Sequence, residues 1–475
     1  MHNSDEIWRL VDAKREPFVA LSDRVWAMPE LCYAETRSCA EHAAMLAAEG
    51  FRVTAAVAGI PTAVMGEAGE GGPVIAILGE YDALPGLSQA TGIAEPRPLP
   101  GDGSGHGCGH NLLGSASLLA ATAVKDWLAA NNLPGRVRYY GCPAEEGGAA
   151  KGFMVRDGAF DDVDIAITWH PAAFSKVGEA LSLANTRIDF SFVGRASHAA
   201  AAPHLGRSAL DAVELMNVGV NYLREHMPSD ARVHYAYLDA GGIAPNVVQP
   251  TAKVRYLIRA RDLSELTPLV ARVRKIADGA ALMTETSVTT RVISAVSNML
   301  GNTPLEQAMQ AEFDRLGPPS FDAADRARAA EFQATMTEAD IASSWRRAGL
   351  PMRDGVSLCE AVVPREAKGV PMIGSSDVGD VSWKVPTIEA RGATYAIGTP
   401  GHSWQLTAQG MLPAAHKGML HVAKVMGATA AAALRDPELI ARAKADHTER
   451  TGGRPYLSPL PPGATPALDM SGGPA

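Results

Sequence analysis

The chain has 475 residues, of which 47% are hydrophobic and 20% charged, and this size suits a globular protein of two domains. Its formal net charge of −9 argues against a nucleic-acid binder, which usually presents a basic face, and no apolar run approaches the length of a membrane span. Five scattered cysteines and an N-terminus without a signal-peptide pattern predict reduced thiols and a cytoplasmic location.

Helices and strands are predicted to alternate over the first part of the chain. Helical spacing of apolar residues covers 4–28 and 34–49, and a long helix is expected up to about residue 131, with Asn111 as its cap. Apolar runs typical of buried strands lie between these helices and after the long one, at 51–58, 74–78, 137–141 and 163–168. This alternation predicts an α/β domain with helices packed on a sheet.

The pattern changes after about residue 180, where strands and helices follow in the order βαββαβ. The strands are expected at 182–193, 232–238, 252–260 and 287–293, and the helices at 207–226 and 264–283. This is the order of a ferredoxin-like unit, so we predict an inserted second domain at 182–297 within a first domain formed by 1–181 and 298–475. Residues 315–370 are predicted to form helices and loops. The tail from Gly452, rich in proline and glycine, is expected to lie on the surface or be disordered.

Three strands of the first domain end in chemically active side chains. The strand at 74–78 leads to Asp82, the strand at 137–141 leads to Glu145 and Glu146, and the strand at 163–168 leads to His170. Ligands of open α/β sheets bind at the carboxyl ends of the strands. We therefore expect these side chains to line one site.

A glycine-rich turn, Gly105–Asn111, places a thiol and an imidazole two residues apart, just before the long helix. Together with distant residues it completes a set of metal-ligand types, namely Cys108, His110, Glu146, His170 and His402. Five protein ligands exceed the three that one catalytic zinc usually takes, and they suit a two-metal site. Glu145, beside one of these ligands, is predicted to stay free as the general base that moves a proton during amide hydrolysis.

Each of these residues also has a structural interpretation. Cys108 can be a small buried hydrophobic residue, and a glutamate pair is usually a solvated surface feature. His170 can cap a strand, and His402 can be an ordinary loop histidine. Asp82 can be a turn-forming aspartate. Which of Cys108 and His110 would bridge two metals stays open.

Six motifs together resemble the aminoacylase/carboxypeptidase family of dinuclear metallo-amidohydrolases, in the branch with plant auxin-conjugate hydrolases and bacterial p-aminobenzoyl-glutamate hydrolases. The motifs are GHGCGHNLLG (105–114), CPAEEGG (142–148), TWHP (168–171), ASHAAAAPHLG (196–206), GGIAPNVVQ (241–249) and DVGDVSW (377–383). The resemblance implies a zinc-peptidase-like three-layer α/β/α catalytic domain with an inserted ferredoxin-like dimerisation, or lid, domain. It also implies the five metal ligands, two divalent ions (Zn or Mn) per subunit and Glu145 as general base.

The resemblance assigns further residues by position. Asp82 matches an acidic residue that orients a metal ligand. His198 matches a lid histidine that reaches the active site of a partner subunit, where it would stabilise the oxyanion. Asn246 and Arg259 match lid residues that hold the carboxylate of the substrate. A strand would place Arg255 and Arg261 on the same face as Arg259, so which arginine contacts substrate stays open.

The resemblance implies a metal-dependent amidohydrolase that cleaves the amide of an N-acyl or N-aroyl amino acid with a free carboxylate. The best single candidate is p-aminobenzoyl-glutamate, cleaved to p-aminobenzoate and glutamate. Auxin–amino acid conjugates, other N-acyl amino acids and dipeptides are alternatives, as is a non-catalytic subunit of a heterodimer. A homodimer is expected because the edge of the lid sheet can pair with a second copy, and a heterodimer with a paralogous A subunit is the alternative.

Overall fold

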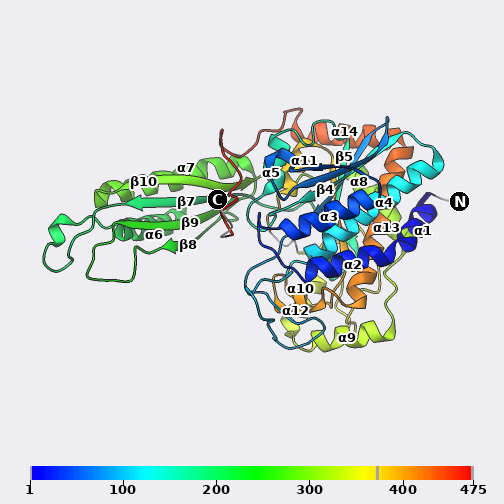
Figure 1. Ribbon diagram of the computed structural model, residues 1–475, viewed down its shortest axis with the longest axis horizontal. Helices are drawn as coiled ribbons and strands as arrows, with labels where there is room; N and C mark the ends of the chain where they lie inside the picture. The colour runs from blue at the N-terminus through cyan, green and yellow to red at the C-terminus, as the bar shows by residue number, and fades with distance from the viewer. Residues whose placement is uncertain (1–2, 371–373, 472–475) are drawn as a thin grey trace.

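The computed structural model describes residues 3–370 and 374–471 and contains two sheets, each with its own helices (Figure 1). The larger sheet has seven strands. Their order in space is β1 (Arg52–Ala55), β2 (Val64–Glu70), β4 (Gly135–Cys142), β3 (Val74–Glu80), β5 (Ile165–Ala172), β11 (Thr387–Ala393) and β6 (Lys176–Val177). The four central strands β4, β3, β5 and β11 are parallel, so their carboxyl ends meet at one edge.

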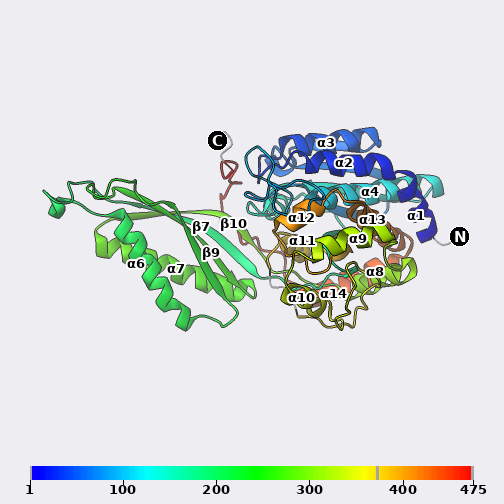
Figure 2. The same ribbon diagram turned by 90° about the horizontal axis from the view of Figure 1, so that it is seen from below.

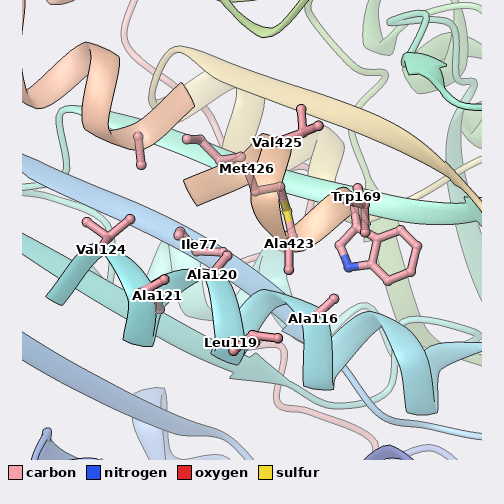
Figure 3. Close-up of a cluster of buried hydrophobic side chains, with 14 of the residues drawn as sticks. Ile77, Ala116, Leu119, Ala120, Ala121, Val124, Trp169, Ala423, Val425 and Met426 are labelled. Carbon is pink, nitrogen blue, oxygen red and sulfur yellow. The ribbon is translucent and has the colours of Figure 1, made fainter. Parts of the chain in front are cut away.

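Helices cover both faces of this sheet. One face packs against α1 (Asn3–Ala13), α2 (Arg15–Trp26), α3 (Thr36–Ala48), α4 (His110–Asn131), α8 (Thr303–Leu316), α13 (Pro413–Arg435) and α14 (Pro437–Thr451). The other face packs against the short helices α5 (Ala150–Arg156) and α11 (Val378–Lys384). Figure 3 shows small residues of α4 and α13 packed with Ile77 and Trp169 of the sheet. The predicted three-layer α/β/α arrangement is confirmed.

The smaller sheet is built from one contiguous stretch of chain. In chain order its elements are β7 (Ala184–Val193), α6 (Ala209–Leu223), β8 (Arg232–Asp239), β9 (Thr251–Ala260), α7 (Leu263–Thr284) and β10 (Ser287–Val296). The strand order is β10-β7-β9-β8 and all pairs are antiparallel, which is the predicted ferredoxin-like topology. We call this unit the lid and retain its predicted limits, 182–297, as a proposal.

The lid projects from the larger part, and both of its helices lie on the same side of its sheet (Figure 2). Apolar residues alternate along β9, so that Val254, Tyr256 and Ile258 pack under these helices while the residues between them are partly exposed. The lid sheet therefore has one covered face and one open polar face.

Further short helices decorate the larger part. They are α9 (Ala323–Gln333), α10 (Glu338–Ala348) and α12 (Trp404–Gln409), with a 3₁₀ turn at Val57–Gly59. The lid has two further 3₁₀ turns, at Pro203–Leu205 and Arg224–His226. The helices and loops predicted for 315–370 are thus present. Among the described residues, every helix is too short or too polar to cross a membrane.

Some elements differ from the prediction. The helical run at 4–28 is two helices that meet at Lys14, and strands β2 and β11 were not predicted. Asn111 does not cap α4, because Gly109 precedes the helix in the left-handed conformation (φ 77°) and the Asn111 amide donates to Ser22 and to the carbonyl of Gly410 instead.

The C-terminal tail packs more firmly than its composition suggests. Leu460 and Ala467 are buried, and Asp469 accepts two hydrogen bonds from Arg291 of the lid strand β10. The Ser471 hydroxyl donates to the carbonyl of Cys32 at 2.7 Å. The described part of the tail therefore contacts both the larger part and the lid, and disorder, one of its two predicted alternatives, is wrong for these residues.

Candidate metal centre

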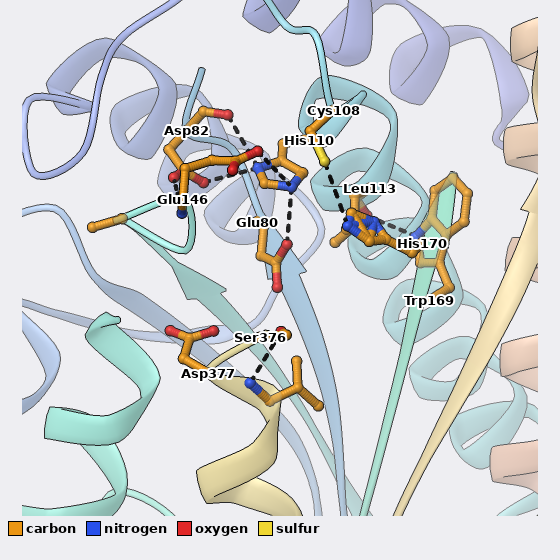
Figure 4. Close-up of polar contacts among 12 residues, drawn as sticks. Glu80, Asp82, Cys108, His110, Leu113, Glu146, Trp169, His170, Ser376 and Asp377 are labelled. Atoms are coloured by element: carbon orange, nitrogen blue, oxygen red, sulfur yellow. Dashed lines mark hydrogen bonds and ion pairs between the residues drawn. The ribbon is translucent and has the colours of Figure 1, made fainter. Parts of the chain in front are cut away.

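The predicted metal ligands, with Glu145 and Asp82, meet at the carboxyl edge of the seven-stranded sheet. Asp82 follows β3, Glu146 follows β4, His170 lies near the end of β5, and His402 lies on the loop after β11. Figure 4 shows the side chains of Cys108, His110, Glu146 and His170 turned toward one another above these strands. The parallel strands thus bring together residues that are far apart in the sequence.

The glycine-rich turn before α4 positions Cys108 and His110 because side chains would not fit beside them. A Cβ on Gly109 would lie 2.9 Å from the Pro171 ring, and one on Gly107 would lie 2.3 Å from Leu87. The absence of these side chains lets the turn approach the end of β5. There the Cys108 Sγ atom lies 3.6 Å from Nε2 of His170.

The Glu145–Glu146 turn is held in an unusual backbone conformation. Ala144 and Ala149, which flank it, both have left-handed conformations, with φ of 56° and 54°. Such values are uncommon for residues with a Cβ and often occur at functional sites. The backbone amide of Glu146 donates to Oδ2 of Asp82 at 2.9 Å, which fixes the turn against the end of β3.

His402 also has a left-handed backbone, with φ 53°, and its amide donates to the carbonyl of Gly107 at 3.1 Å. This bond ties the His402 loop to the turn that carries Cys108. The Nε2 atom of His402 lies 3.4 Å from Oε1 of Glu146, although the His402 side chain is 54% exposed. His402 therefore reaches the other predicted ligands from the open side of the site.

The ligand atoms form overlapping groups that fit metal ions. Cys108, His110 and His170 form one group, and Cys108, Glu146 and His402 form a second, with all ligand atoms of each group within 4.8 Å of one another. Three buried polar atoms of these residues make no hydrogen bond within the described chain, namely His110 Nε2, His170 Nδ1 and Glu146 Oε1. The nearest charged groups are Glu80 Oε2, 3.3 Å from His110 Nε2, and His402 Nε2, 3.4 Å from Glu146 Oε1. Buried polar atoms are rarely left unpaired, so this donor set fits a pair of cations. Cys108 is common to both groups, so the two groups would hold neighbouring ions.

Asp82 contacts the ligand that it was predicted to orient. Its Oδ1 atom lies 2.9 Å from Nδ1 of His110, on the side of the ring away from the unpartnered Nε2 atom. Burial alone would raise the pKa of Asp82, but the charge and hydrogen bond of His110 hold it below its ordinary value. A carboxylate in this position fixes the ring orientation and the tautomer of a metal-binding histidine.

Three buried charged residues beneath the site were not predicted. Lys151 of α5 is fully buried, and its Nζ atom donates to Glu80 at 2.6 Å and to Asp377 at 2.7 Å. Burial would lower the pKa of Lys151, but the two carboxylates raise it well above its ordinary value. Glu80 Oε2 in turn lies 3.3 Å from His110 Nε2, and Glu80, His110 and Glu145 form a third group of potential ligands. The sequence signal that could have revealed this buried cluster is the lysine among the apolar residues at the start of α5.

A cleft of about 900 Å³ opens between this centre and the lid. Glu145 lines it, and burial together with the carboxylates of Glu80 and Glu146 raises the pKa of Glu145 well above its ordinary value. Arg259 lines the same cleft from β9. Of its two neighbours, Arg255 is paired with Asp189, and Arg261 lies beyond the end of the strand, paired with Glu265.

His198 and Asn246 do not line this cleft. They lie on the exposed loops that follow β7 and precede β9, at the end of the lid away from the seven-stranded sheet. Their backbones are close together, since the amide of Ala199 donates to the carbonyl of Asn246. The single chain therefore brings eight of the ten predicted residues to the cleft or its floor, and leaves these two outside it.

Comparisons with known proteins agree with this geometry. A family model described as peptidase family M20/M25/M40 matches residues 76–473. The chain is 46% identical to the B subunit of p-aminobenzoyl-glutamate hydrolase from Escherichia coli K12, over 97% of this chain and 99% of the relative.

Two solved structures support the fold. A dinuclear metal binding peptidase of the M20 family from Bacillus subtilis has a TM-score of 0.54 at 17% identity, covering 88% of this chain and 98% of that one. An aminobenzoyl-glutamate utilization protein from Klebsiella pneumoniae has a TM-score of 0.51 at 18% identity, covering 70% and 90%. With the family match spanning most of its length, the chain belongs to peptidase family M20/M25/M40.

Proposed function

We propose that this chain is a metal-dependent amidohydrolase that cleaves the amide of an N-acyl or N-aroyl amino acid. The preferred substrate is p-aminobenzoyl-glutamate, which would yield p-aminobenzoate and glutamate. The observation that carries this proposal is a complete set of ligand types beside a second glutamate, Glu145, in a chain 46% identical to one component of a p-aminobenzoyl-glutamate hydrolase. The name of that relative supports the choice of substrate.

Two divalent ions, zinc or manganese, would be held by Cys108, His110, Glu146, His170 and His402. Some buried nitrogen and oxygen atoms of this set make no hydrogen bond within the described chain, and this supports the assignment because a bound cation would satisfy them. A thiolate among the ligands favours zinc on ligand type. When bound, such ions supply Lewis-acid activation of water and of the amide carbonyl.

Glu145 is proposed as the general base. It lines the cleft next to Glu146. Burial and the carboxylates of Glu80 and Glu146 raise the pKa of Glu145. In the proposed reaction it accepts the proton of the attacking water and returns it to the nitrogen of the leaving amino acid. Asp82 holds His110 in place during this step, and Arg259 binds a carboxylate of the substrate.

His198 and Asn246 are proposed to act on the cleft of a second subunit, since they lie far from their own cleft. Strand β8, one of the two edge strands of the lid sheet, can pair with another lid. A homodimer is the preferred assembly. Because the similar Escherichia coli hydrolase has two kinds of subunit, a heterodimer with a paralogous A subunit is the alternative. Light scattering of the purified chain distinguishes the two, and a fully active monomer would contradict the role of His198 in trans.

The test of the function is hydrolysis by the purified chain, with manganese or zinc added, of p-aminobenzoyl-glutamate and a panel of other N-acyl amino acids. Glu145→Gln should lower kcat by at least about 1000-fold while elemental analysis still finds the metal, because the variant keeps every proposed ligand. A chain that is inactive alone but active after addition of an A subunit would show the heterodimer to be the working form. Normal turnover by the variant would exclude the proposed mechanism.

A further inference from the structure

The open face of the lid sheet forms one wall of the cleft. Arg187 of β7 and Arg259 of β9 both point from this face, since they are an even number of residues from Asp189 and Arg255, which meet on it. Both line the cleft, whose opposite wall carries Glu145 and the proposed metal ligands. A substrate that reaches the metal centre through this cleft therefore lies close to these two guanidinium groups.

These two arginines have no carboxylate partner within residues 3–370 and 374–471. The only hydrogen bonds that their guanidinium groups make there are from Arg187 to the carbonyl of Gly147, at 2.9 Å, and from Arg259 to the hydroxyl of Ser375, at 3.1 Å. Arg255, on the same face, instead makes two bonds to Asp189, at 2.6 and 3.1 Å. Arg291, opposite Asp189 on the same face, pairs with Asp469, while Arg232, opposite Arg259, bonds only to backbone carbonyls. Among the described residues, the face thus pairs Arg255 and Arg291 with carboxylates and leaves Arg187, Arg259 and the more exposed Arg232 without a carboxylate within ion-pair distance.

Leaving a partly buried guanidinium without an anion costs free energy. Burial lowers the pKa of Arg187 and of Arg259, and the Nε atom of Arg259 is buried without a partner. Such a cost is expected where a ligand supplies the missing charge. Because a guanidinium has five N–H donors, each of these arginines keeps donors available for a carboxylate.

The spacing of the two arginines allows them to hold two carboxylates of one ligand. In the ladder between β7 and β9, Arg187 lies opposite Leu257 and Arg259 lies opposite Asn185. The two arginines are therefore diagonal neighbours, about 7–8 Å apart at the backbone. Long side chains starting at this separation can hold the two carboxylates of one short dicarboxylic amino acid at the same time.

Arg187 is also fixed close to the metal centre. The Gly147 carbonyl that it contacts follows Glu146 directly, and the hydroxyl of Ser294 on the neighbouring strand donates to the same oxygen at 3.0 Å. Arg187 and the proposed ligand Glu146 are near enough for their charges to interact. The guanidinium is thus held beside the position that the leaving amino acid would occupy.

We infer that Arg187 binds the side-chain carboxylate of the leaving amino acid and sets a preference for glutamate or aspartate conjugates over conjugates of neutral amino acids. The inference rests on the proposed amidohydrolase function, in which Arg259 takes the α-carboxylate. Arg187 is thus the residue that would recognise the second negative charge of the substrate.

The test compares p-aminobenzoyl-glutamate with p-aminobenzoyl-glutamine, which differ only in the carboxylate that Arg187 would bind. Arg187→Gln should lower kcat/KM for the glutamate conjugate roughly 10- to 100-fold and change that for the glutamine conjugate less than about 3-fold. Arg187→Lys, which keeps the charge, should restore part of the preference. An unchanged preference in Arg187→Gln would overturn the inference.

Two control variants separate charge recognition from support of the metal loop. Ser294→Ala removes the other donor to Gly147 and should leave the preference unchanged. Arg255→Gln, whose charge is already balanced by Asp189, should also leave it unchanged. Equal losses on both substrates in Arg187→Gln, reproduced by Ser294→Ala, would assign Arg187 to positioning of the loop and contradict the inference.

A binding measurement keeps this test independent of turnover. Calorimetry in the Glu145→Gln background, with metal present, gives the affinities of both conjugates with and without Arg187. A binding preference for the glutamate conjugate that disappears with Arg187→Gln supports the inference. This holds even if the wild-type chain hydrolyses neither compound, because the absence of hydrolysis would reject only the proposed function. Equal affinities in the presence of Arg187 would reject the inference alone.

Discussion

The two walls of the cleft are incomplete in opposite ways. At the carboxyl edge of the seven-stranded sheet, buried nitrogen and oxygen atoms of His110, His170 and Glu146 make no hydrogen bond within the described chain. On the open face of the lid, Arg187 and Arg259 lack acidic partners among the described residues. One wall thus fits cations and the other fits an anion, so the cleft is electrostatically complete only when metal ions and a negatively charged substrate are both present.

The two walls also differ in how they stabilise the charges that they already contain. Beneath the metal centre, the fully buried Lys151 is balanced by Glu80 and Asp377, with no water-exposed side chain among the three. The charges of the lid face lie at a partly exposed surface. We therefore expect charge removal to be costly for folding on the first wall and nearly neutral on the second.

The largest effect is expected for Lys151→Met, which leaves two buried carboxylates without a cation. Breaking a buried ion pair from one side costs about 3–5 kcal/mol of unfolding free energy. Metal affinity should not fall, because the loss of the ammonium leaves the negative charge of Glu80 unpaired 3.3 Å from Nε2 of the proposed ligand His110. Urea unfolding and elemental analysis measure the two effects.

The triple variant Lys151→Met, Glu80→Gln, Asp377→Asn removes all three charges and should recover a large part of the lost stability. Lys125→Met is the matched control, since Lys125 pairs with its neighbour Asp126 at a partly exposed position and should contribute less than about 1 kcal/mol. If Lys151→Met were as mild as this control, the cluster would not have the structural role that its burial implies.

The residues at the strand ends could be predicted from the sequence because each follows an apolar strand directly. Asp82, Glu146 and His170 need only the rule that parallel strands present their carboxyl ends at one edge. The ferredoxin-like order could be predicted for a similar reason, since its strands alternate clearly between apolar and polar residues. Where local pattern and tertiary structure agree, the sequence is sufficient.

The remaining features depend on tertiary pairing that no local pattern encodes. Lys151 finds its partners 71 and 226 residues away, so its neutralisation cannot be read from the apolar segment around it. Strand β2, with two glycines in seven residues, has little strand propensity of its own and exists because β4 pairs with it. Arg187 and Arg255 look equivalent in the sequence, and only the position of Asp189 distinguishes the paired arginine from the unpaired one.

A change of pH is expected to have an intermediate effect on the unfolding free energy. This effect should come from the part of the molecule built on the seven-stranded sheet rather than from the lid. His421 is buried in α13, donates to the carbonyl of Gly317 at 2.7 Å, and has its pKa lowered to about 4 by burial. Between the unfolded value of about 6.5 and this folded value, the unfolded chain binds more protons. The contribution of His421 to the unfolding free energy should therefore be fully present above about pH 6.5. It should fall by about 1.4 kcal/mol per pH unit as the pH is lowered toward 4.

His421→Gln keeps an N–H donor for Gly317 and removes the titration, so urea unfolding at pH 7.5 and pH 5 should show a smaller acid-dependent loss than wild type. The lid offers the matched control, because all four of its histidines are exposed. His226→Gln should leave the pH dependence as it is in wild type. A wild-type slope in His421→Gln would mean that this histidine is protonated in the folded state.

The smallest effect on folding is expected for Arg259→Gln, although its effect on substrate binding should be large. The substitution removes a charge that no carboxylate of the described chain balances, and it retains an amide that can still donate to Ser375. The gain from removing a partly buried cation and the loss of one hydrogen bond are similar in size, so the unfolding free energy should stay within about 1 kcal/mol of wild type. The KM for p-aminobenzoyl-glutamate should rise at least about 10-fold, since a charged hydrogen bond to the α-carboxylate is lost. A destabilisation as large as that of Lys151→Met, without a change in KM, would show that Arg259 supports the lid rather than the substrate, and the contrast between the two walls would fail.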